Sequence, residues 1–174
     1  MIETLEGLRV VLRAPQPTDR ADRLAAGRDP EFHRMVGGSR SIPGPLTPAD
    51  VDRWYASLVS EPYAWVVAFG DRCIGVARLH HVDRSQGVGS YAVGLFRPEH
   101  RGQGLGQEIT RLVLEYAFDT LCLQRVQLKV LDFNQRAIAC YRKCGFVEVE
   151  REPVQLADEV AADVLMEARP PVLG

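Results

Sequence analysis

Three glycines within six residues, RGQGLG at 101–106, are the feature that most limits how this chain can fold. Glycine adopts backbone angles that other residues avoid, and it lets a ligand approach the main chain closely. The stretch lies between an apolar run, SYAVGLFRPEH, and a segment with helical spacing, QEITRLVLEYAFDTL. A strand that enters a helix through such a turn exposes the N–H groups of the first helical turn, which bind phosphate well. The sequence therefore predicts a phosphate-binding turn here.

Patterns on either side of this turn alternate between strands and helices. Strand patterns cover residues 8–15, 64–70, 73–82, 88–96, 125–131, 146–150 and 162–168. Helical patterns cover residues 18–36 with an interruption near Asp29-Pro30, a segment that starts at Thr47, residues 107–121 and residues 134–144. Hairpins precede the glycine turn, and helices and strands alternate after it. This order predicts an α+β domain around one mixed, mostly antiparallel sheet of about six to seven strands with about four helices.

The length and charge of the chain exclude several classes of protein. A chain of 174 residues makes one domain of ordinary size, which we expect over residues 1–169 with a tail at 170–174. The net charge of −2 gives no general attraction to nucleic acid or to an anionic membrane. No apolar run approaches the roughly 18 residues that span a bilayer, and MIETLEGLRV lacks the layout of a signal peptide. We expect a cytoplasmic protein without a nucleic-acid or membrane partner.

The cysteines do not form a recognisable metal or disulfide pattern. They lie at positions 73, 122, 140 and 144 and show no CxxC spacing. Cys140 and Cys144 are four residues apart on an expected helix, so we interpret them as buried thiols rather than as ligands or a bridge. We expect no metal in the site.

The glycine turn is compatible with some nucleotide sites and not with others. A P-loop needs Lys followed by Ser or Thr after its glycines, and neither pair follows here. The dinucleotide fingerprint GxGxxG is only partly met, because Gly102, Gly104 and Gly106 alternate as GxGxG. The fingerprint also needs an acidic residue at the end of the next strand, about 20 residues on, and Asp132 lies there but somewhat late. Hairpins before the turn also argue against that fold. A glycine-rich turn without any ligand is the remaining simple alternative.

The pattern Arg101-x-x-Gly104-x-Gly106 resembles the central signature of the GNAT superfamily, the acetyl-coenzyme A-dependent N-acetyltransferases. That signature follows a strand ending near a proline, and LFRPEHRGQGLG matches it in full. A second stretch, NQRAIACYRKCGF at 134–146, is similar to the other family motif: Asn at a helix start, Ala three residues on, Tyr at seven, then Gly-Phe. The resemblance implies a GNAT-like fold, with the sheet splayed in its middle, and acetyl transfer from acetyl-CoA to a primary amine by direct attack.

The resemblance also implies which residues bind acetyl-CoA. They are Leu95, Phe96, Arg97, Pro98, Arg101, Gly102, Gln103, Gly104, Leu105, Gly106, Gln107 and Asn134. Main-chain N–H groups of residues 101–106 would surround the pyrophosphate through charge-assisted hydrogen bonds. The strand before the turn would separate from its neighbour, so that backbone groups of residues 95–97 receive the pantetheine arm. Among these, the Phe96 N–H is expected to polarise the thioester carbonyl.

Asn134 and Tyr141 are seven residues apart, which places them within about 20° on one helix face. Asn134 would be expected there as a helix cap alone, and Tyr141 could equally belong to the core. The family resemblance implies instead that Asn134 reaches the pantetheine arm. It also implies that Tyr141 is the general acid, giving a proton to the coenzyme A thiolate as it leaves.

No general base is evident from the sequence. In some ribosomal-protein acetyltransferases of this superfamily a glutamate lies five residues before the motif Asn, where this chain has Lys129. Another family position for a glutamate corresponds to Tyr91. His80, His81 and Asp83 lie nearby, and a histidine of ordinary pKa could serve. Adjacent strand residues face opposite ways, so we expect only one of the two histidines to face a cleft. A water chain is the remaining alternative.

The sequence leaves several classes of amine open as the acceptor. An α-amine with a pKa near 7.7 loses its proton at a cost of about 1 kcal/mol at pH 7, whereas a lysine costs about 4.6 kcal/mol. A site without a strong base therefore favours a protein N-terminal α-amine, and LRVVLRAPQPTD resembles the branch that acetylates ribosomal-protein N-termini. Small amines such as antibiotics or polyamines, and a non-catalytic acyl-CoA-binding module, are alternatives. Residues 37–48 and 80–89 are expected to flank the acceptor. The sequence does not fix the oligomeric state, and a homodimer is one of the possible states.

Overall fold

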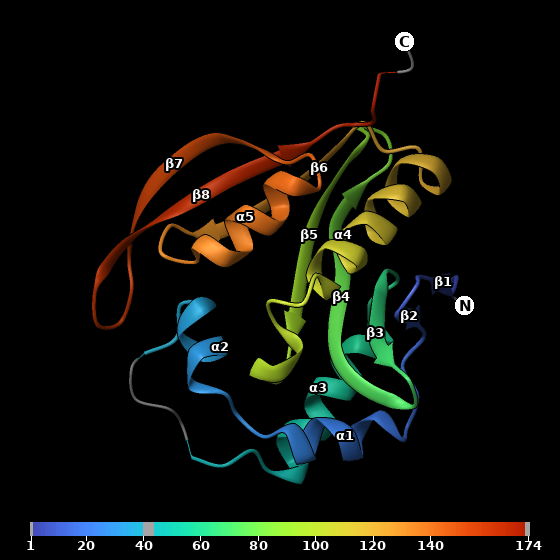
Figure 1. The fold of residues 1–174 in the computed structure, drawn as a ribbon, viewed down its shortest axis with the longest axis vertical. Coiled ribbons are helices and arrows are strands. Elements are labelled where there is room, and N and C mark those ends of the chain that lie inside the picture. The colour runs from blue at the N-terminus through green and yellow to red at the C-terminus, as the bar shows by residue number, and fades with distance from the viewer. Residues whose placement is uncertain (1, 40–43, 173–174) are drawn as a thin grey trace.

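A single sheet of eight strands forms the frame of the computed structural model, which describes residues 2–39 and 44–172 (Figure 1). The strands are β1 (Leu5–Glu6), β2 (Val10–Arg13), β3 (Ala64–Phe69), β4 (Arg72–Asp83), β5 (Val88–Leu95), β6 (Arg125–Leu131), β7 (Val147–Gln155) and β8 (Val160–Ala168). Their order in the sheet is β1-β2-β3-β4-β5-β6-β8-β7, and among them only β5 and β6 pair in parallel. The predicted mixed, mostly antiparallel α+β fold is confirmed, with slightly more strands than expected.

Five α-helices within the described residues cover the sheet. They are α1 (Asp19–Ala26), α2 (Pro30–Met35), α3 (Pro48–Ser60), α4 (Leu105–Glu115) and α5 (Gln135–Lys143). The number exceeds the prediction because the helical pattern over residues 18–36 is divided in two. Gly27 ends α1 at a φ of 67°, and the Asp29 carboxylate caps α2 by accepting a hydrogen bond from the Phe32 N–H at 3.0 Å. Pro30 at the first position of α2 fixes that start.

The sheet separates at its middle, as the family resemblance implied. The parallel register between β5 and β6 covers only Val88–Ser90 against Arg125–Gln127. Beyond those residues, β5 continues along β4 as far as Leu95, and β6 continues along β8 as far as Leu131. The two strands therefore diverge. Beyond Ser90 in β5 and Gln127 in β6, the facing backbone edges have no strand partner among the described residues.

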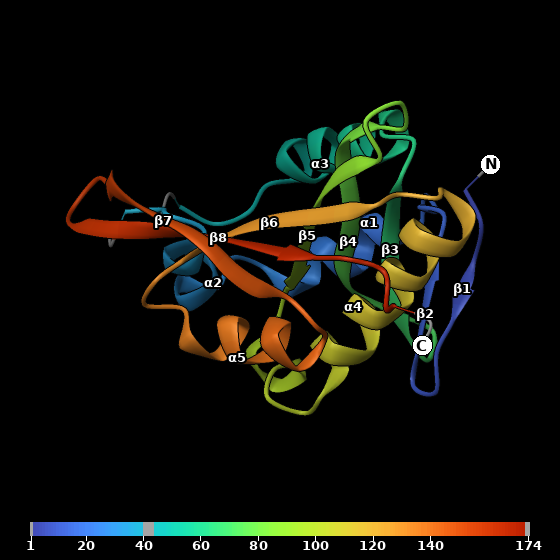
Figure 2. The same ribbon diagram turned by 90° about the horizontal axis from the view of Figure 1, so that it is seen from above.

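Helices lie on both faces of this sheet. Figure 2 shows α4 and α5 on one side and α3 on the other. The alternate β6 residues Val126, Leu128 and Val130 belong to the larger core, which includes residues of α4 and α5. Gln127, Lys129 and Leu131 therefore project from the opposite face. The same alternation along β8 places Val164 and Met166 in the core and Asp163 on the opposite face.

Candidate active site

A cavity of about 630 Å³ occupies the divergence between β5 and β6. Its size lies within the range of small-molecule binding sites. The walls are residues 91–95 of β5, residues 129–131 of β6, the glycine turn, the inner face of α5, and parts of α2 and β8. Because these walls come from both faces of the sheet, the cavity runs through the sheet from the α4–α5 side to the α2 side.

The glycine turn forms one end of the cavity. Gly102 and Gly104 have φ angles of 73° and 82°, in the left-handed region that favours glycine, and Gly104 is the N-cap of α4. Among the described residues, the N–H groups of residues 102–107 find no hydrogen-bond acceptor. Six neighbouring free donors at a helix N-terminus make a favourable site for a phosphate group.

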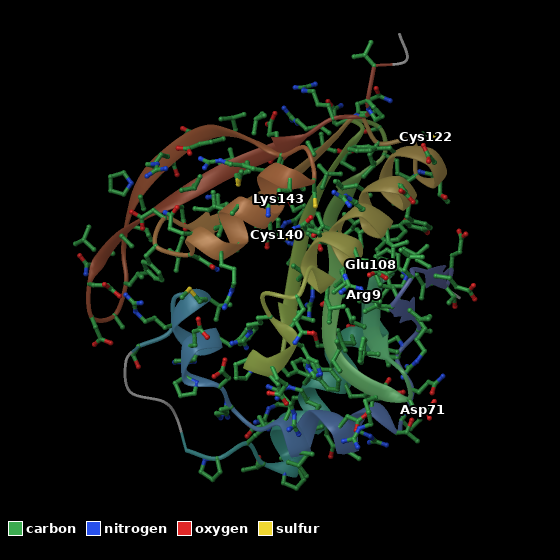
Figure 3. All side chains as sticks on the ribbon, in the orientation of Figure 1. Arg9, Asp71, Glu108, Cys122, Cys140 and Lys143 are labelled. Carbon is green, nitrogen blue, oxygen red and sulfur yellow. The ribbon has the colours of Figure 1, made fainter. Side chains whose placement is uncertain are left out.

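Gly106 has a different role from the other two glycines. A Cβ at this position would lie 3.4 Å from the Cys140 Sγ on α5. That distance is an ordinary van der Waals contact, so α5 lies directly beside the first turn of α4 and an alanine would also fit there. Figure 3 shows Cys140 and Lys143 on α5, and both residues line the cavity.

A contact between β2 and α4 holds the turn in place. The Glu108 Oε1 accepts hydrogen bonds from the N–H groups of Arg9 and Val10 at 2.7 and 3.1 Å. The Arg9 guanidinium bonds the other Glu108 oxygen and the carbonyl of Gln103 at 2.7 Å (Figure 3). Burial of Glu108 acts to raise its pKa, but these N–H groups outweigh that effect and leave the pKa below its usual value.

Arg101 binds protein groups. Its guanidinium donates to the Leu95 carbonyl at 2.8 Å and to the carboxylates of Asp29 and Glu31 at the start of α2. Glu31 also pairs with Arg136 on α5 at 3.1 Å. Arg101 lines the cavity, yet its charge is already used to attach α2 across the open end of the divergence, where Figure 1 shows that helix.

The backbone donor assigned to the thioester carbonyl has to be corrected. The Phe96 N–H donates to the Ile74 carbonyl of β4 at 2.9 Å, so it is not free. Backbone groups along an antiparallel strand alternate in direction. The N–H groups of Val93 and Leu95 therefore point away from β4, into the cavity that both residues line.

Several other residues predicted to bind the donor lie outside the cavity walls. Phe96 packs between Trp54 and the core of the opposite face. Arg97 turns toward α1 and donates to the Ala25 carbonyl at 3.1 Å, and Pro98 begins a short 3₁₀ turn. Leu105 is fully buried in the core. The Gln103 side chain bonds the Glu99 carbonyl, so Gln103 contributes only its main-chain N–H to the turn.

Asn134 and Tyr141 both line the cavity from α5. Asn134 is the N-cap, and its Oδ1 accepts a hydrogen bond from the Ala137 N–H at 3.3 Å, which leaves its amide N–H groups without a partner among the described residues. Tyr141 is buried beside Tyr91 and Phe146, with ring centroids 6.3 and 5.7 Å away. Burial raises the pKa of the Tyr141 hydroxyl, so this group keeps its proton at neutral pH.

Tyr91 and Asp83 do not suit the role of general base. Tyr91 is completely buried, its hydroxyl lies 3.0 Å from the Thr110 Oγ1, and burial raises its pKa well above the usual value. The Asp83 carboxylate accepts hydrogen bonds from Ser85 and from the Gln86 N–H, which stabilises the turn after β4. Those hydrogen bonds lower the pKa of Asp83.

His80 and His81 line a second cavity, of about 490 Å³, apart from the glycine turn and α5. The prediction that they face opposite ways is wrong. The β4–β5 register shifts between His80 and Asp83, and His81 has a φ of 48°, so this bulge turns both rings to one side. Their Nδ1 atoms lie 3.0 Å apart. Neither histidine lines the larger cavity.

Some cavity residues were not identified from the sequence. Phe32, Met35 and Val36 come from α2 and its C-terminal end, and Asp163 comes from β8. Asp163 could have been noticed, since it is the one charged residue in the apolar run AADVLM. The α2 residues gave no such signal. The predicted acceptor loop at 37–48 is only partly described, because residues 40–43 lie outside the described residues, as do 173–174 of the predicted tail.

A family model described as an acetyltransferase (GNAT) domain matches residues 9–147. The chain belongs to the GNAT family. It is an acetyl-CoA-dependent N-acetyltransferase, with acetyl-CoA as the acetyl donor and an amine as the acceptor. The free N–H groups of the glycine turn and the through-sheet cavity of this GNAT protein fit a diphosphate and its pantetheine arm.

Similar proteins agree with this family but do not define the acceptor. An uncharacterized SPbeta prophage-derived N-acetyltransferase of Bacillus subtilis is 27% identical over 144 residues, which make up 82% of this chain and 78% of that protein. A spermidine N(1)-acetyltransferase of Vibrio cholerae is 37% identical over 54 residues, 31% of each chain. These relatives do not single out the branch that acetylates ribosomal-protein N-termini.

Solved structures support the fold. A GNAT-family acetyltransferase from Bacillus anthracis superposes with a TM-score of 0.80 at 13% identity, covering 96% of this chain and 98% of that one. A spermidine N-acetyltransferase from Vibrio cholerae, in complex with CoA and spermine, gives 0.76 at 19% identity over 92% and 95% of the two chains. Within the described residues, no helix is long and apolar enough to cross a bilayer, and no three His, Cys, Asp or Glu side chains group as metal ligands.

Proposed function

We propose that this GNAT enzyme joins acetyl-CoA and a primary amine in one cavity and transfers the acetyl group directly between them. The observation that carries the proposal is the cavity itself, which runs through the sheet with free main-chain donors at one end. Residues 1–169 act as one catalytic domain in this proposal. Donor and acceptor enter from opposite faces, so neither has to leave before the other binds.

The donor binds at the α4–α5 face. Its diphosphate accepts hydrogen bonds from the N–H groups of residues 102–107, where the positive end of the α4 dipole adds to the attraction. Lys143 lines this part of the cavity and supplies a further positive charge. The pantetheine arm runs along the unpaired edge of β5, and Asn134 offers its free amide N–H groups to it.

Carbonyl activation comes from the free β5 backbone rather than from Phe96. The Leu95 N–H, with the Val93 N–H behind it, donates to the thioester oxygen as negative charge develops there. The neutral amine attacks the carbonyl carbon and forms the C–N bond. The C–S bond then breaks, and Tyr141 gives its proton to the departing thiolate. The new amide nitrogen returns a proton to the Tyr141 oxygen, so the enzyme ends unchanged.

In this scheme solvent water accepts the proton of the incoming ammonium, because His80 and His81 line another cavity. Among the original candidates, a protein N-terminal α-amine makes the smallest demand, about 1 kcal/mol at pH 7. Small amines are the second candidate. They are favoured by local similarity to enzymes named for spermidine and thialysine, the latter from Bos taurus, 47% identical over 49 residues, which are 28% of each chain.

Direct transfer has a simple test. The purified protein is incubated with acetyl-CoA, with and without a mixed panel of amines, and both the intact-protein mass and coenzyme A release are followed. We expect an unchanged protein mass without acceptor and coenzyme A release only with acceptor. Stoichiometric acetylation of the enzyme before acceptor is added would contradict direct transfer, and failure to bind acetyl-CoA would contradict the whole proposal.

A further inference from the structure

Two opposite charges face the cavity on the side of the sheet away from α4 and α5. Lys129 on β6 and Asp163 on β8 both line the cavity, and each alternates with core residues that point to the other face. Leu131, the cross-strand partner of Asp163, lies beside Gly37 at the end of α2. This is the face from which the acceptor enters.

Neither charge is paired within the part of the chain that the structure describes. Among the described residues, Lys129 and Asp163 have no ion pair and no hydrogen bond through their side chains. Arg101 and Arg136, which also line the cavity, are paired with acidic groups at the start of α2. Asp163 is the one carboxylate among the cavity walls of the described chain. The acceptor face thus offers one free cation and one free anion.

The strand positions of the two residues suit a short molecule that carries both signs of charge. Lys129 pairs with Leu165 and Asp163 pairs with Leu131, so Lys129 and Asp163 are diagonal neighbours across β6 and β8. The backbone positions of such neighbours lie about 7–8 Å apart. From positions this close, the long Lys129 side chain and the short Asp163 side chain can both reach one small molecule through charge-assisted hydrogen bonds.

We propose that the acceptor is a zwitterion of the α-amino acid class, with its amine held by Asp163 and its carboxylate held by Lys129. This inference rests on the proposed function and specifies its acceptor. Asp163 orients the ammonium, and after the proton has left to water it accepts a hydrogen bond from the neutral amine. A polyamine would bring a second ammonium to Lys129, and the N-terminal residue of a peptide has no carboxylate on the carbon that carries its amine.

The test compares acceptors that differ only in the carboxylate. Each common amino acid is assayed for acetyl transfer beside its carboxamide and its decarboxylated amine, together with a diamine and a tripeptide. For the best amino acid we expect kcat/KM to exceed that of its carboxamide by about tenfold, the usual scale for one well-placed charge pair. Calorimetric binding of acetyl-CoA is measured in parallel for every variant.

Charge variants assign the preference to these two residues. Lys129→Glu should invert the ranking, so that the diamine exceeds the amino acid, while Lys129→Arg should retain it. Asp163→Asn should lower kcat/KM for all amines about tenfold or more, and Asp163→Glu should recover part of the loss. The matched control is Glu152→Gln, because Glu152 lies opposite Asp163 on β7 but does not line the cavity. Acetyl-CoA affinity should stay within about twofold throughout.

Each result of these assays either supports or overturns the assignment of a zwitterionic acceptor. Inversion by Lys129→Glu with an unaffected Glu152→Gln supports the inference. Preference of the wild-type protein for the carboxamide, the diamine or the tripeptide overturns it, as does a ranking that the variants do not alter. Acetyl-CoA binding without transfer to any amino acid overturns the inference and leaves the proposed function standing. Loss of acetyl-CoA binding in the wild-type protein overturns both.

Discussion

The hydroxyl of Tyr141 is the single group on which the proposed proton transfer depends. Burial raises its pKa, so the proton stays on the oxygen until a stronger base, the thiolate, forms beside it. Tyr91 lies in the same aromatic cluster, but its hydroxyl is engaged with Thr110. Two buried tyrosines in one cavity are therefore expected to have different roles.

Replacement of Tyr141 by Phe should separate catalysis from binding. We expect kcat to fall by about 10²–10⁴-fold, the usual contribution of general acid catalysis, while the Kd for acetyl-CoA stays within about twofold. Tyr91→Phe is the control, since it removes one hydrogen bond and costs about 1 kcal/mol of stability without removing the acid. Steady-state kinetics and calorimetry measure both. Equal losses of kcat in the two variants would contradict the assignment.

The pH profile provides an independent check of the same hydroxyl. A general acid works while protonated, and the pKa of Tyr141 is raised, so activity should persist through the ordinary tyrosine pKa of about 10. We therefore expect kcat measured from pH 7 to pH 10 to show no falling limb. A falling limb near neutral pH that disappears in Tyr141→Phe would show that the pKa is lowered, contrary to the structure.

Gly104 should tolerate no side chain without loss of donor affinity. Because Gly104 has a φ of 82° at the start of α4, Gly104→Ala strains the turn. The added methyl carbon would also lie 3.3 Å from a guanidinium nitrogen of Arg9, the side chain that holds the Gln103 carbonyl of the turn. Gly70→Ala, at a φ of 58° in the β3–β4 hairpin, carries similar strain away from the cavity. Both should lose about 1–2 kcal/mol of stability. Only Gly104→Ala should weaken acetyl-CoA binding, by roughly tenfold or more in calorimetry.

At this scale the sequence indicated which residues meet in the cavity better than it indicated the directions of their groups. The spacing of the two family motifs pointed to the glycine turn, Asn134 and Tyr141, and all of them line the cavity, while their roles stay predictions. Phe96 was assigned wrongly because the direction of an N–H depends on pairing with β4, which a single strand does not reveal. Asp163 was missed because its proximity to Lys129 arises from the β6–β8 register.

The β2–α4 contact is the element-level feature that fixes the phosphate turn. Glu108 accepts hydrogen bonds from the backbone N–H groups of Arg9, just before β2, and Val10, its first residue. The pKa of Glu108 is lowered in the folded state. A lowered folded pKa stabilises the protein above the unfolded pKa of about 4.3, and this contribution is lost as pH falls through the folded pKa.

Glu108→Gln should therefore reduce stability in a pH-dependent way. We expect the free energy of unfolding to fall by about 1–3 kcal/mol at pH 7, and the difference from wild type to shrink as pH falls below about 4. Urea titrations at several pH values measure this difference. Glu115→Gln, an exposed substitution on the same helix, should have little effect at any pH. A difference for Glu108→Gln that grows toward low pH would contradict the structure.

Elements were predicted well where periodicity was long and poorly where it was interrupted. The helical pattern at 18–36 became α1 and α2 because Gly27 and Pro30 divide it. The bulge at His81 reversed the expected side-chain alternation of β4. The break in the helix had a local signal at Asp29-Pro30, whereas the bulge depends on the neighbouring strand and has none.

At the scale of the whole molecule, the sheet is two halves that meet over a short parallel contact between β5 and β6. The ion pairs of α2 with Arg101 and Arg136 connect the halves at the open end. The order of elements predicted the fold class and the position of the glycine turn. The walls added by α2 could not be predicted, because they depend on how that helix lies across the divergence.

A ligand that fills this divergence should stabilise the whole domain. At a concentration of about 100 times its Kd, acetyl-CoA should add about 2.7 kcal/mol, which raises the Tm by roughly 5–10 °C for a chain of this length. NAD at the same concentration should give no comparable shift, since the turn lacks the dinucleotide spacing. A thermal-shift series measures both, and stabilisation by NAD alone would favour the dinucleotide interpretation.

A crystal structure with saturating acetyl-CoA examines the central claim most directly. We predict diphosphate oxygens within hydrogen-bond distance of the N–H groups of residues 102–107. The thioester should lie between β5 and β6, with its oxygen near the Leu95 N–H and its sulfur near the Tyr141 hydroxyl. A ligand bound elsewhere on the protein, or an empty divergence in the presence of saturating thioester, would contradict the account.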